Sequence, residues 1–204
     1  VGEGLYSSIK IHDQKVGNKT LRTLNRDTNN SSAIFLESSE LPFDYTKFAE
    51  LYKILIPEAD NFLMLGGGAY TVPRRLSQID EDLNIDVVEI EPMLYDLAKE
   101  YFDFTPTDKI KNFPTDARIF LSQTDTNYDV VFADTFGTDL ASPFHLTTLE
   151  FYKLVSNRLN DDGVLMINFI GRIKGERPSL TGSFIKTLTT VFPNTKAYAL
   201  RPEN

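Results

Sequence analysis

Three consecutive glycines, Gly66 to Gly68, and a later acid, Glu89, are residues whose types and spacing suggest chemistry. The glycines follow the apolar run Phe62 to Leu65 and precede a helical stretch. Backbone without side chains lets a ligand approach closely there, and a helix N-terminus offers unpaired N–H groups. Glu89 lies about twenty residues further on, at the end of the next apolar run, where a carboxylate can accept both hydroxyl groups of a ribose. Each feature alone also suits a tight turn or a solvated strand end, but together they predict a nucleoside site.

Two further acids lie at the borders of later segments. Asp116 precedes the helical stretch Ala117 to Gln123, so it could cap that helix, accept a hydrogen bond from an adenine amino group, or do both. Asp134 ends the strand-like run Tyr128 to Ala133 and opens a loop whose next acid is Asp139. An acid in that place suits a general base or a group that positions substrate. The residues do not choose between NAD and S-adenosylmethionine, although the glycine cluster lacks the last glycine or alanine of the dinucleotide fingerprint.

The elements that must position these acids form two regions. Residues 1–44 contain short strand-like runs joined by turns rich in Asn, Asp, Gly and Ser, which predicts a small N-terminal antiparallel β unit. A helix is expected over about residues 45–56. From residue 62 onward, apolar strands alternate with helical stretches, as far as a last strand over 195–200. Strands that are apolar on both faces and separated by helices predict the α/β class, with a doubly wound, mostly parallel, Rossmann-like sheet in residues 45–204.

Composition excludes several classes of function. The 204 residues include 21 basic and 29 acidic side chains, and the net charge of -8 suits a cationic ligand and opposes nucleic acid. The chain has no cysteine and two histidines, so we expect no metal site. No apolar run approaches the roughly 18 to 20 residues that cross a bilayer. Because the chain begins at Val1 and ends directly after a strand-like run, we expect it to be a piece of a longer protein.

With these residues in view, the chain resembles the spermidine synthase family, the aminopropyltransferases built on the methyltransferase-type Rossmann fold. Leu65 to Gly68 is similar to the family's triple-glycine turn, and Val88 to Glu91 is similar to its Glu-Ile-Asp motif. Asp116 and Ala117 lie at the family's adenine position, and Tyr128 to Asp134 precedes its gate loop. Tyr45 lies where the family has a substrate-side tyrosine.

The resemblance implies a donor of the decarboxylated S-adenosylmethionine type and no metal. The residues that it implies for the donor are Gly66, Gly67, Gly68, Glu89, Ile90, Asp116 and Ala117. It also implies that Asp134 and Tyr45 are catalytic, Asp134 by orienting and deprotonating the attacking amine. Tyr45 and Asp139 are the residues expected to contact the small-molecule amine substrate.

Departures from the family pattern keep two other functions open. Ala69 stands where the family has an aspartate that meets the free amine of the donor, and the gate loop lacks the family's Asp-x-x-Asp-Pro sequence. One alternative is a small-molecule methyltransferase that uses intact S-adenosylmethionine. The other is a non-catalytic domain that binds a nucleoside or a polyamine and regulates an attached membrane segment.

The departures also bear on the cellular context. The pattern resembles divergent spermidine-synthase-like domains, including those attached to membrane-spanning segments in longer proteins. We therefore expect a cytoplasmic domain, with a membrane segment elsewhere in the parent protein. The N-terminal β unit leaves strand edges to cover, so it is a candidate surface for a homodimer.

Overall fold

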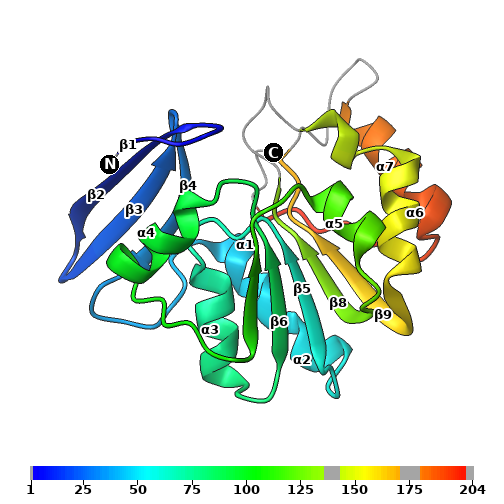
Figure 1. The fold of residues 1–204 in the computed structure, drawn as a ribbon, viewed down its shortest axis with the longest axis horizontal. Helices are drawn as coiled ribbons and strands as arrows, with labels where there is room; N and C mark the ends of the chain where they lie inside the picture. The colour runs from blue at the N-terminus through cyan, green and yellow to red at the C-terminus, as the bar shows by residue number, and fades with distance from the viewer. Residues whose placement is uncertain (1, 136–142, 171–179, 201–204) are drawn as a thin grey trace.

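The computed structural model describes residues 2–135, 143–170 and 180–200 and contains two sheets (Figure 1). The N-terminal sheet is antiparallel in the order β1-β2-β3-β4, and its strands are Gly2–Glu3, Ser8–Val16, Lys19–Arg26 and Asn29–Phe35. Two-residue turns join β2 to β3 and β3 to β4. Gly17 and Asp27 adopt left-handed backbone in these turns, with φ of 61° and 55°. The antiparallel β unit is therefore confirmed, and its turn residues supply the conformation that the hairpins need.

The second sheet contains five parallel strands in the order β7-β6-β5-β8-β9. In chain order the strands are Asn61–Leu65 (β5), Asn84–Val88 (β6), Ile110–Phe113 (β7), Tyr128–Ala133 (β8) and Leu159–Ile167 (β9). The chain builds outward from β5 to β7 and then crosses back to place β8 on the other side of β5. Ligands of open α/β sheets bind beyond the carboxyl ends of the strands at such a reversal.

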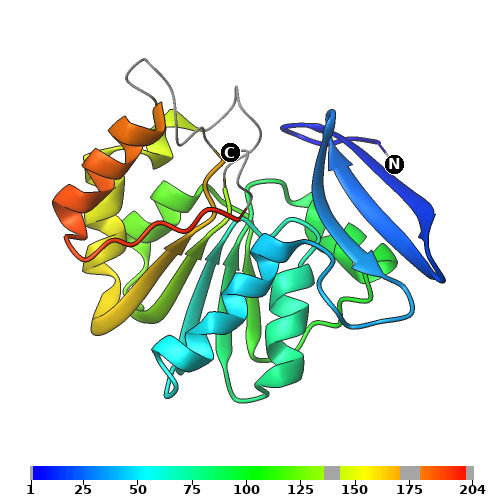
Figure 2. The same ribbon diagram turned by 180° about the vertical axis from the view of Figure 1, so that it is seen from behind.

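Helices cover both faces of the parallel sheet (Figures 1 and 2). On one face lie α1 (Asp44–Lys47), η1 (Phe48–Leu51), α2 (Tyr52–Leu55) and α3 (Thr71–Ile79), and α4 (Met93–Tyr101) packs against the antiparallel sheet. On the other lie α5 (Ala117–Gln123), η2 (Phe144–Leu146), α6 (Leu149–Asn157) and α7 (Leu180–Val191). Alternate residues of β5 serve the two cores, with Phe62 and Met64 on the α2–α3 side and Leu63 and Leu65 on the α5–α6 side. The Rossmann-like, doubly wound sheet is therefore confirmed.

Three elements differ from the sequence prediction. The helix expected over 45–56 is divided into α1, η1 and α2, because four of its residues follow the tighter 3₁₀ path. The strand expected over 195–200 does not form, and Tyr198 is 74% exposed there. Strand β7 was not predicted, since Ile110–Phe113 has only two apolar residues among four. Within the described ranges, no helix is both long and apolar enough to cross a membrane.

Candidate functional site

The glycine turn joins β5 to α3 and is packed closely on two sides. Gly66 has φ of 92°, and a Cβ atom there would collide with the carbonyl oxygen of Asp134. Gly68 has φ of 53°, and a Cβ atom there would lie 2.5 Å from Ser32 Oγ of the antiparallel sheet. The turn therefore needs glycine at these positions for both backbone conformation and space. Ser32 Oγ also accepts a hydrogen bond from the backbone N–H of Ala69 at 3.0 Å, which ties the antiparallel sheet to the turn.

Glu89 follows β6 and is 3% exposed. Its Oε2 accepts a hydrogen bond from Gly68 N at 2.9 Å, and its Oε1 accepts one from Glu91 N at 3.0 Å. The guanidinium of Arg26, from β3, lies 3.7 Å from Oε1. These contacts hold the carboxylate beside the glycine turn, and each oxygen keeps a second lone pair for a ligand hydroxyl.

Asp116 performs the capping role that the sequence allowed. Its Oδ1 accepts hydrogen bonds from Arg118 N at 2.8 Å and Ile119 N at 3.1 Å, so it caps α5. Its Oδ2 accepts a hydrogen bond from His145 Nε2 at 2.8 Å. Burial pushes the pKa of Asp116 upward, but the hydrogen bonds from His145 and the two amides outweigh it and hold that pKa below its usual value. A base bound here meets an ionised carboxylate whose outer oxygen is shared with His145.

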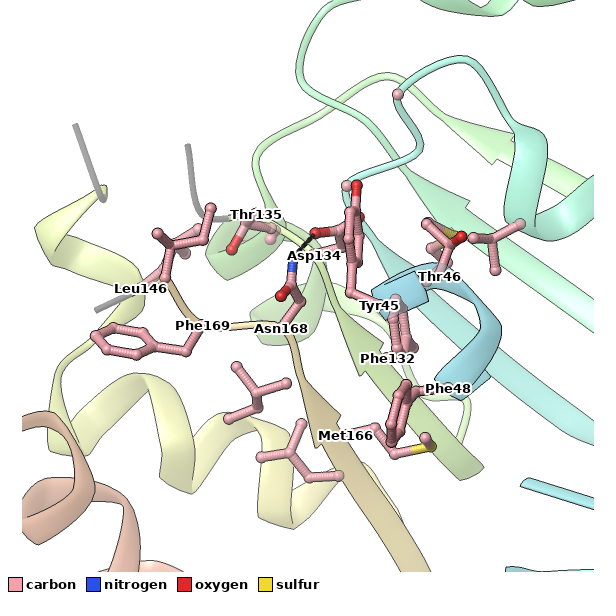
Figure 3. A pocket seen from close by; sticks show the side chains of 18 of the residues that line it. Tyr45, Thr46, Phe48, Phe132, Asp134, Thr135, Leu146, Met166, Asn168 and Phe169 are labelled. Atoms are coloured by element: carbon pink, nitrogen blue, oxygen red, sulfur yellow. Dashed lines mark hydrogen bonds between the residues drawn. The ribbon is translucent and has the colours of Figure 1, made fainter. Parts of the chain in front are cut away.

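Asp134 and Asn168 stand side by side at the carboxyl ends of β8 and β9 (Figure 3). Asn168 Nδ2 donates a hydrogen bond to Asp134 Oδ1 at 2.8 Å. Burial raises the pKa of Asp134 to about 6; the Asn168 hydrogen bond and Tyr45 oppose this rise, and the negative charge of Glu89 adds to it. Tyr45 lies beside Asp134, and burial, followed by the Asp134 charge, raises the pKa of its hydroxyl. The tyrosine therefore stays protonated, while Asp134 is ionised at neutral pH yet binds a proton more readily than an ordinary aspartate.

One cavity brings these groups together. Its lining includes Gly66, Gly67, Gly68, Glu89, Ile90, Asp116, Ala117, Tyr45 and Asp134. Asp139, the other residue expected to contact substrate, lies outside the described residues. No cluster of three or more His, Asp or Glu side chains in the described ranges could hold a metal ion. The cavity therefore has the glycine turn with Glu89 and Asp116 on one side and the polar pair Asp134 and Asn168 at the ends of β8 and β9.

Two lining residues were missed by the sequence prediction. Arg26 comes from the antiparallel sheet, and nothing in its local sequence distinguishes it from a surface arginine. Asn168 directly follows β9. Because ligands of open α/β sheets bind beyond the carboxyl ends of the strands, the position that singled out Glu89 and Asp134 was also a signal for Asn168. His145, from η2, contacts Asp116 and also lines the cavity.

Comparison with known proteins finds polyamine-related matches by sequence and by structure. The model of the spermine/spermidine synthase domain matches residues 46–200. A probable polyamine aminopropyl transferase of Bifidobacterium longum is 30% identical over 193 residues, which cover 95% of this chain and 42% of that protein. The crystal structure of a probable spermidine synthase from Corynebacterium glutamicum superposes with a TM-score of 0.71 at 27% identity, over 83% of this chain and 63% of that one.

One further relative has a different activity in its name. An N-terminal histidine N-methyltransferase of Emericella nidulans is 33% identical over 158 residues, which cover 72% of this chain and 27% of that protein. The chain thus spans less than half the length of each of these two curated relatives.

Proposed function

Because the chain belongs to the spermine/spermidine synthase family, we propose that it transfers an aminopropyl group from decarboxylated S-adenosylmethionine to an amine acceptor. The observation that carries this proposal is the position of Asp134. The carboxylate stands at the end of a central strand, beside Asn168, in the same cavity as Glu89 and the glycine turn. A donor held at the turn would present its sulfonium region to the Asp134 end of the cavity.

In this proposal the donor is held by the residues that the structure gathers at the turn. Glu89 accepts the ribose hydroxyls with its remaining lone pairs, and Asp116 accepts the adenine amino group at Oδ2, which His145 now contacts. Ile90 and Ala117, each next in sequence to one of these carboxylates, also line the cavity. Because the contacts come from three different strand ends, the parallel sheet fixes their relative positions.

The transfer step needs a neutral amine beside the sulfonium. The amine nitrogen attacks the carbon next to sulfur, the new C–N bond forms, and the C–S bond breaks with its electron pair going to sulfur, which releases methylthioadenosine. The proton that the amine gives up passes to the Asp134 carboxylate, whose pKa of about 6 leaves it ionised at neutral pH. Tyr45, held in its protonated form, orients the acceptor, so this chain contributes mainly position and a proton acceptor.

A second candidate is methyl transfer from intact S-adenosylmethionine, which Ala69 permits. This residue is fully buried and uncharged, and its backbone N–H is already bonded to Ser32, so it offers no anion to a free amine on the donor. The fungal relative whose name describes an N-methyltransferase matches 72% of the chain. In both candidates the donor would bind at the glycine turn, Glu89 and Asp116, and Asp134 would be the base.

Isothermal calorimetry with the two donors distinguishes the candidates. Aminopropyl transfer predicts tighter binding of decarboxylated S-adenosylmethionine, and methyl transfer predicts tighter binding of the intact donor. Glu89→Gln, which removes the charge and keeps the shape, is expected to weaken both, whereas Asn160→Ala at the far end of β9 serves as a control. Binding of neither donor to the wild-type protein would contradict both candidates. Binding without turnover would favour the non-catalytic, nucleoside-binding domain.

A further inference from the structure

The guanidinium of Arg26 stands beside Glu89 without a hydrogen bond to it. Its Nη1 lies 3.7 Å from Glu89 Oε1, whereas a hydrogen bond from a guanidinium to a carboxylate is about 2.7 to 2.9 Å long. Its Nε donates to Ser7 Oγ at 3.3 Å, so the guanidinium is tethered to the segment before β2. The side chain of Arg26 is 29% exposed and lines the cavity together with Glu89. The two groups are therefore close enough to bind one ligand atom together but too far apart to satisfy each other.

The segment that tethers Arg26 is itself fixed by a buried acid. Glu91 is 1% exposed, and its Oε2 accepts a hydrogen bond from Tyr6 N at 2.9 Å. Gly4 packs so closely on the same oxygen that a Cβ atom there would collide with it. Gly4 N also donates to Ser7 O at 2.9 Å, which closes a turn. The position of Ser7 is thus set before a ligand arrives, and a preorganised guanidinium loses less conformational freedom on binding.

A ribose hydroxyl has two hydrogen-bonding needs, and Glu89 meets one of them. The hydroxyl group carries one hydrogen to donate and two lone pairs that accept. The carboxylate can accept the hydrogen, but it has no hydrogen to offer to the hydroxyl oxygen. An oxygen about 2.8 Å from both Glu89 Oε1 and Arg26 Nη1 fits their separation of 3.7 Å. One hydroxyl can therefore donate to the acid and accept from the guanidinium, which meets both needs inside the cavity.

Because the proposed function places a ribose at Glu89, we propose, resting on it, that Arg26 is a further nucleoside-binding residue, which donates a hydrogen bond to one hydroxyl oxygen of that ribose. Arg26 and Glu89 together then select a ribonucleoside over the nucleoside that lacks this hydroxyl. The deoxy ligand leaves the carboxylate and the guanidinium without their shared partner, and a site built around a hydroxyl discriminates strongly against its absence. A guanidinium suits this place because its charge is permanent and its N–H groups have fixed directions.

A cycle of changes in the protein and in the ligand tests this inference. Methylthioadenosine and its 2′-deoxy and 3′-deoxy analogues are titrated into the wild-type protein and into Arg26→Met, whose side chain is long but has no N–H group. Arg26→Met is expected to weaken the binding of methylthioadenosine about tenfold. One deoxy analogue is expected to bind Arg26→Met and the wild-type protein within about twofold of each other, because it lacks the hydroxyl that Arg26 contacts.

The matched control is Arg22→Met. Arg22 lies on the same strand, β3, pairs with Asp13 at 2.8 Å and is outside the described lining of the cavity. This variant loses a guanidinium from the same sheet but none from the site. All three ligands are therefore expected to bind Arg22→Met as they bind the wild-type protein.

The outcomes separate a contact with the ligand from an effect through Glu89. If Arg26→Met weakens all three ligands equally, Arg26 acts by positioning or neutralising Glu89, and the inference is overturned while the proposed function stands. The same holds if Arg26→Met binds methylthioadenosine as tightly as the wild-type protein does. If the wild-type protein does not bind methylthioadenosine, the proposed function falls, and this inference falls with it.

A crystal structure of the wild-type protein with methylthioadenosine decides the question if Arg26→Met does not fold or if the deoxy analogues bind too weakly to measure. An Arg26 Nη atom within about 3.2 Å of a ribose hydroxyl oxygen is the expected result. A longer distance from Arg26 to both hydroxyl oxygens would overturn the inference.

Discussion

Replacement of Asn168 by leucine is expected to raise the pKa of Asp134 and to slow the reaction at neutral pH. The amide of Asn168 donates to Asp134 Oδ1 at 2.8 Å, and this bond favours the ionised carboxylate. Leucine is similar in size to asparagine and offers the carboxylate no hydrogen-bond donor. The carboxylate then keeps its burial and the nearby charge of Glu89, which both raise its pKa.

The size of the effect follows from the strength of the lost bond. A hydrogen bond to a charged group contributes about 1.5 to 3 kcal/mol, which corresponds to roughly 1 to 2 pKa units. The pKa of Asp134 should therefore rise from about 6 to roughly 7 to 8. At pH 7 the ionised fraction would fall from about nine-tenths to between about one-half and one-tenth, so the rate should fall about two- to tenfold. The difference should shrink as the pH rises to 9, where both proteins are ionised.

Carbon NMR titration of the aspartate carboxyls, assigned with Asp134→Asn, measures this pKa directly, and the pH dependence of the rate provides a second readout. The matched control is Asn160→Leu, since Asn160 lies near the start of β9, the strand that Asn168 follows, and donates to Asp129 at 2.6 Å near the opposite end of β8. The control should leave the titration of Asp134 unchanged. An Asp134 pKa in Asn168→Leu that stays at its wild-type value, or falls, would refute the reasoning.

Further changes test other parts of the site. Gly66→Ala is expected to destabilise the fold by more than about 2 kcal/mol, because the new Cβ meets the Asp134 carbonyl at φ of 92°, whereas Gly2→Ala, with nothing within 4 Å, should be nearly neutral in thermal unfolding. Asp134→Asn is expected to abolish transfer and to stabilise the protein at pH 7.5 by up to about 3 kcal/mol. The reason is that the pKa of Asp134 is raised in the folded state, so ionisation of this carboxyl destabilises the wild-type fold as the pH rises from about 4 to 6. The gain in stability should vanish near pH 3.5, and a gain that does not depend on pH would contradict this origin. Asp116→Ser should keep the cap of α5 and the melting temperature but weaken nucleoside binding in calorimetry. Asp116→Ala should lower the melting temperature and also weaken nucleoside binding. Equal nucleoside affinity in Asp116→Ser and the wild-type protein would exclude a contact between Asp116 and the base.

Much of the cavity beside the glycine turn could be predicted from the sequence because its signals are local. The glycine turn and Glu89 lie in one βαβ unit, and a strand followed by glycines or by an acid reveals its geometry within a few residues. Asp134 was found in the same way, at the end of the apolar run of β8. The structure places the glycine turn, Glu89 and Asp134 in one cavity, and each was predicted from its neighbours in sequence alone.

The other contacts depend on the order of the strands and on packing between elements distant in sequence. Asn168 meets Asp134 because β9 is the neighbour of β8, and 34 residues separate the two side chains. His145 meets Asp116 because η2 packs beside the start of α5. The expected strand over 195–200 shows the converse: its alternating pattern has no pairing partner within the described residues, and a strand requires one.

The most direct test of the proposed transfer is mass spectrometry of the reaction with decarboxylated S-adenosylmethionine and putrescine, with n-pentylamine in a parallel reaction. We predict release of methylthioadenosine together with an amine that has gained one aminopropyl group, and loss of both products in Asp134→Ala. If no methylthioadenosine is released with either amine, or if Asp134→Ala works as well as the wild-type protein, the assignment of this cavity as an aminopropyl transfer site is contradicted.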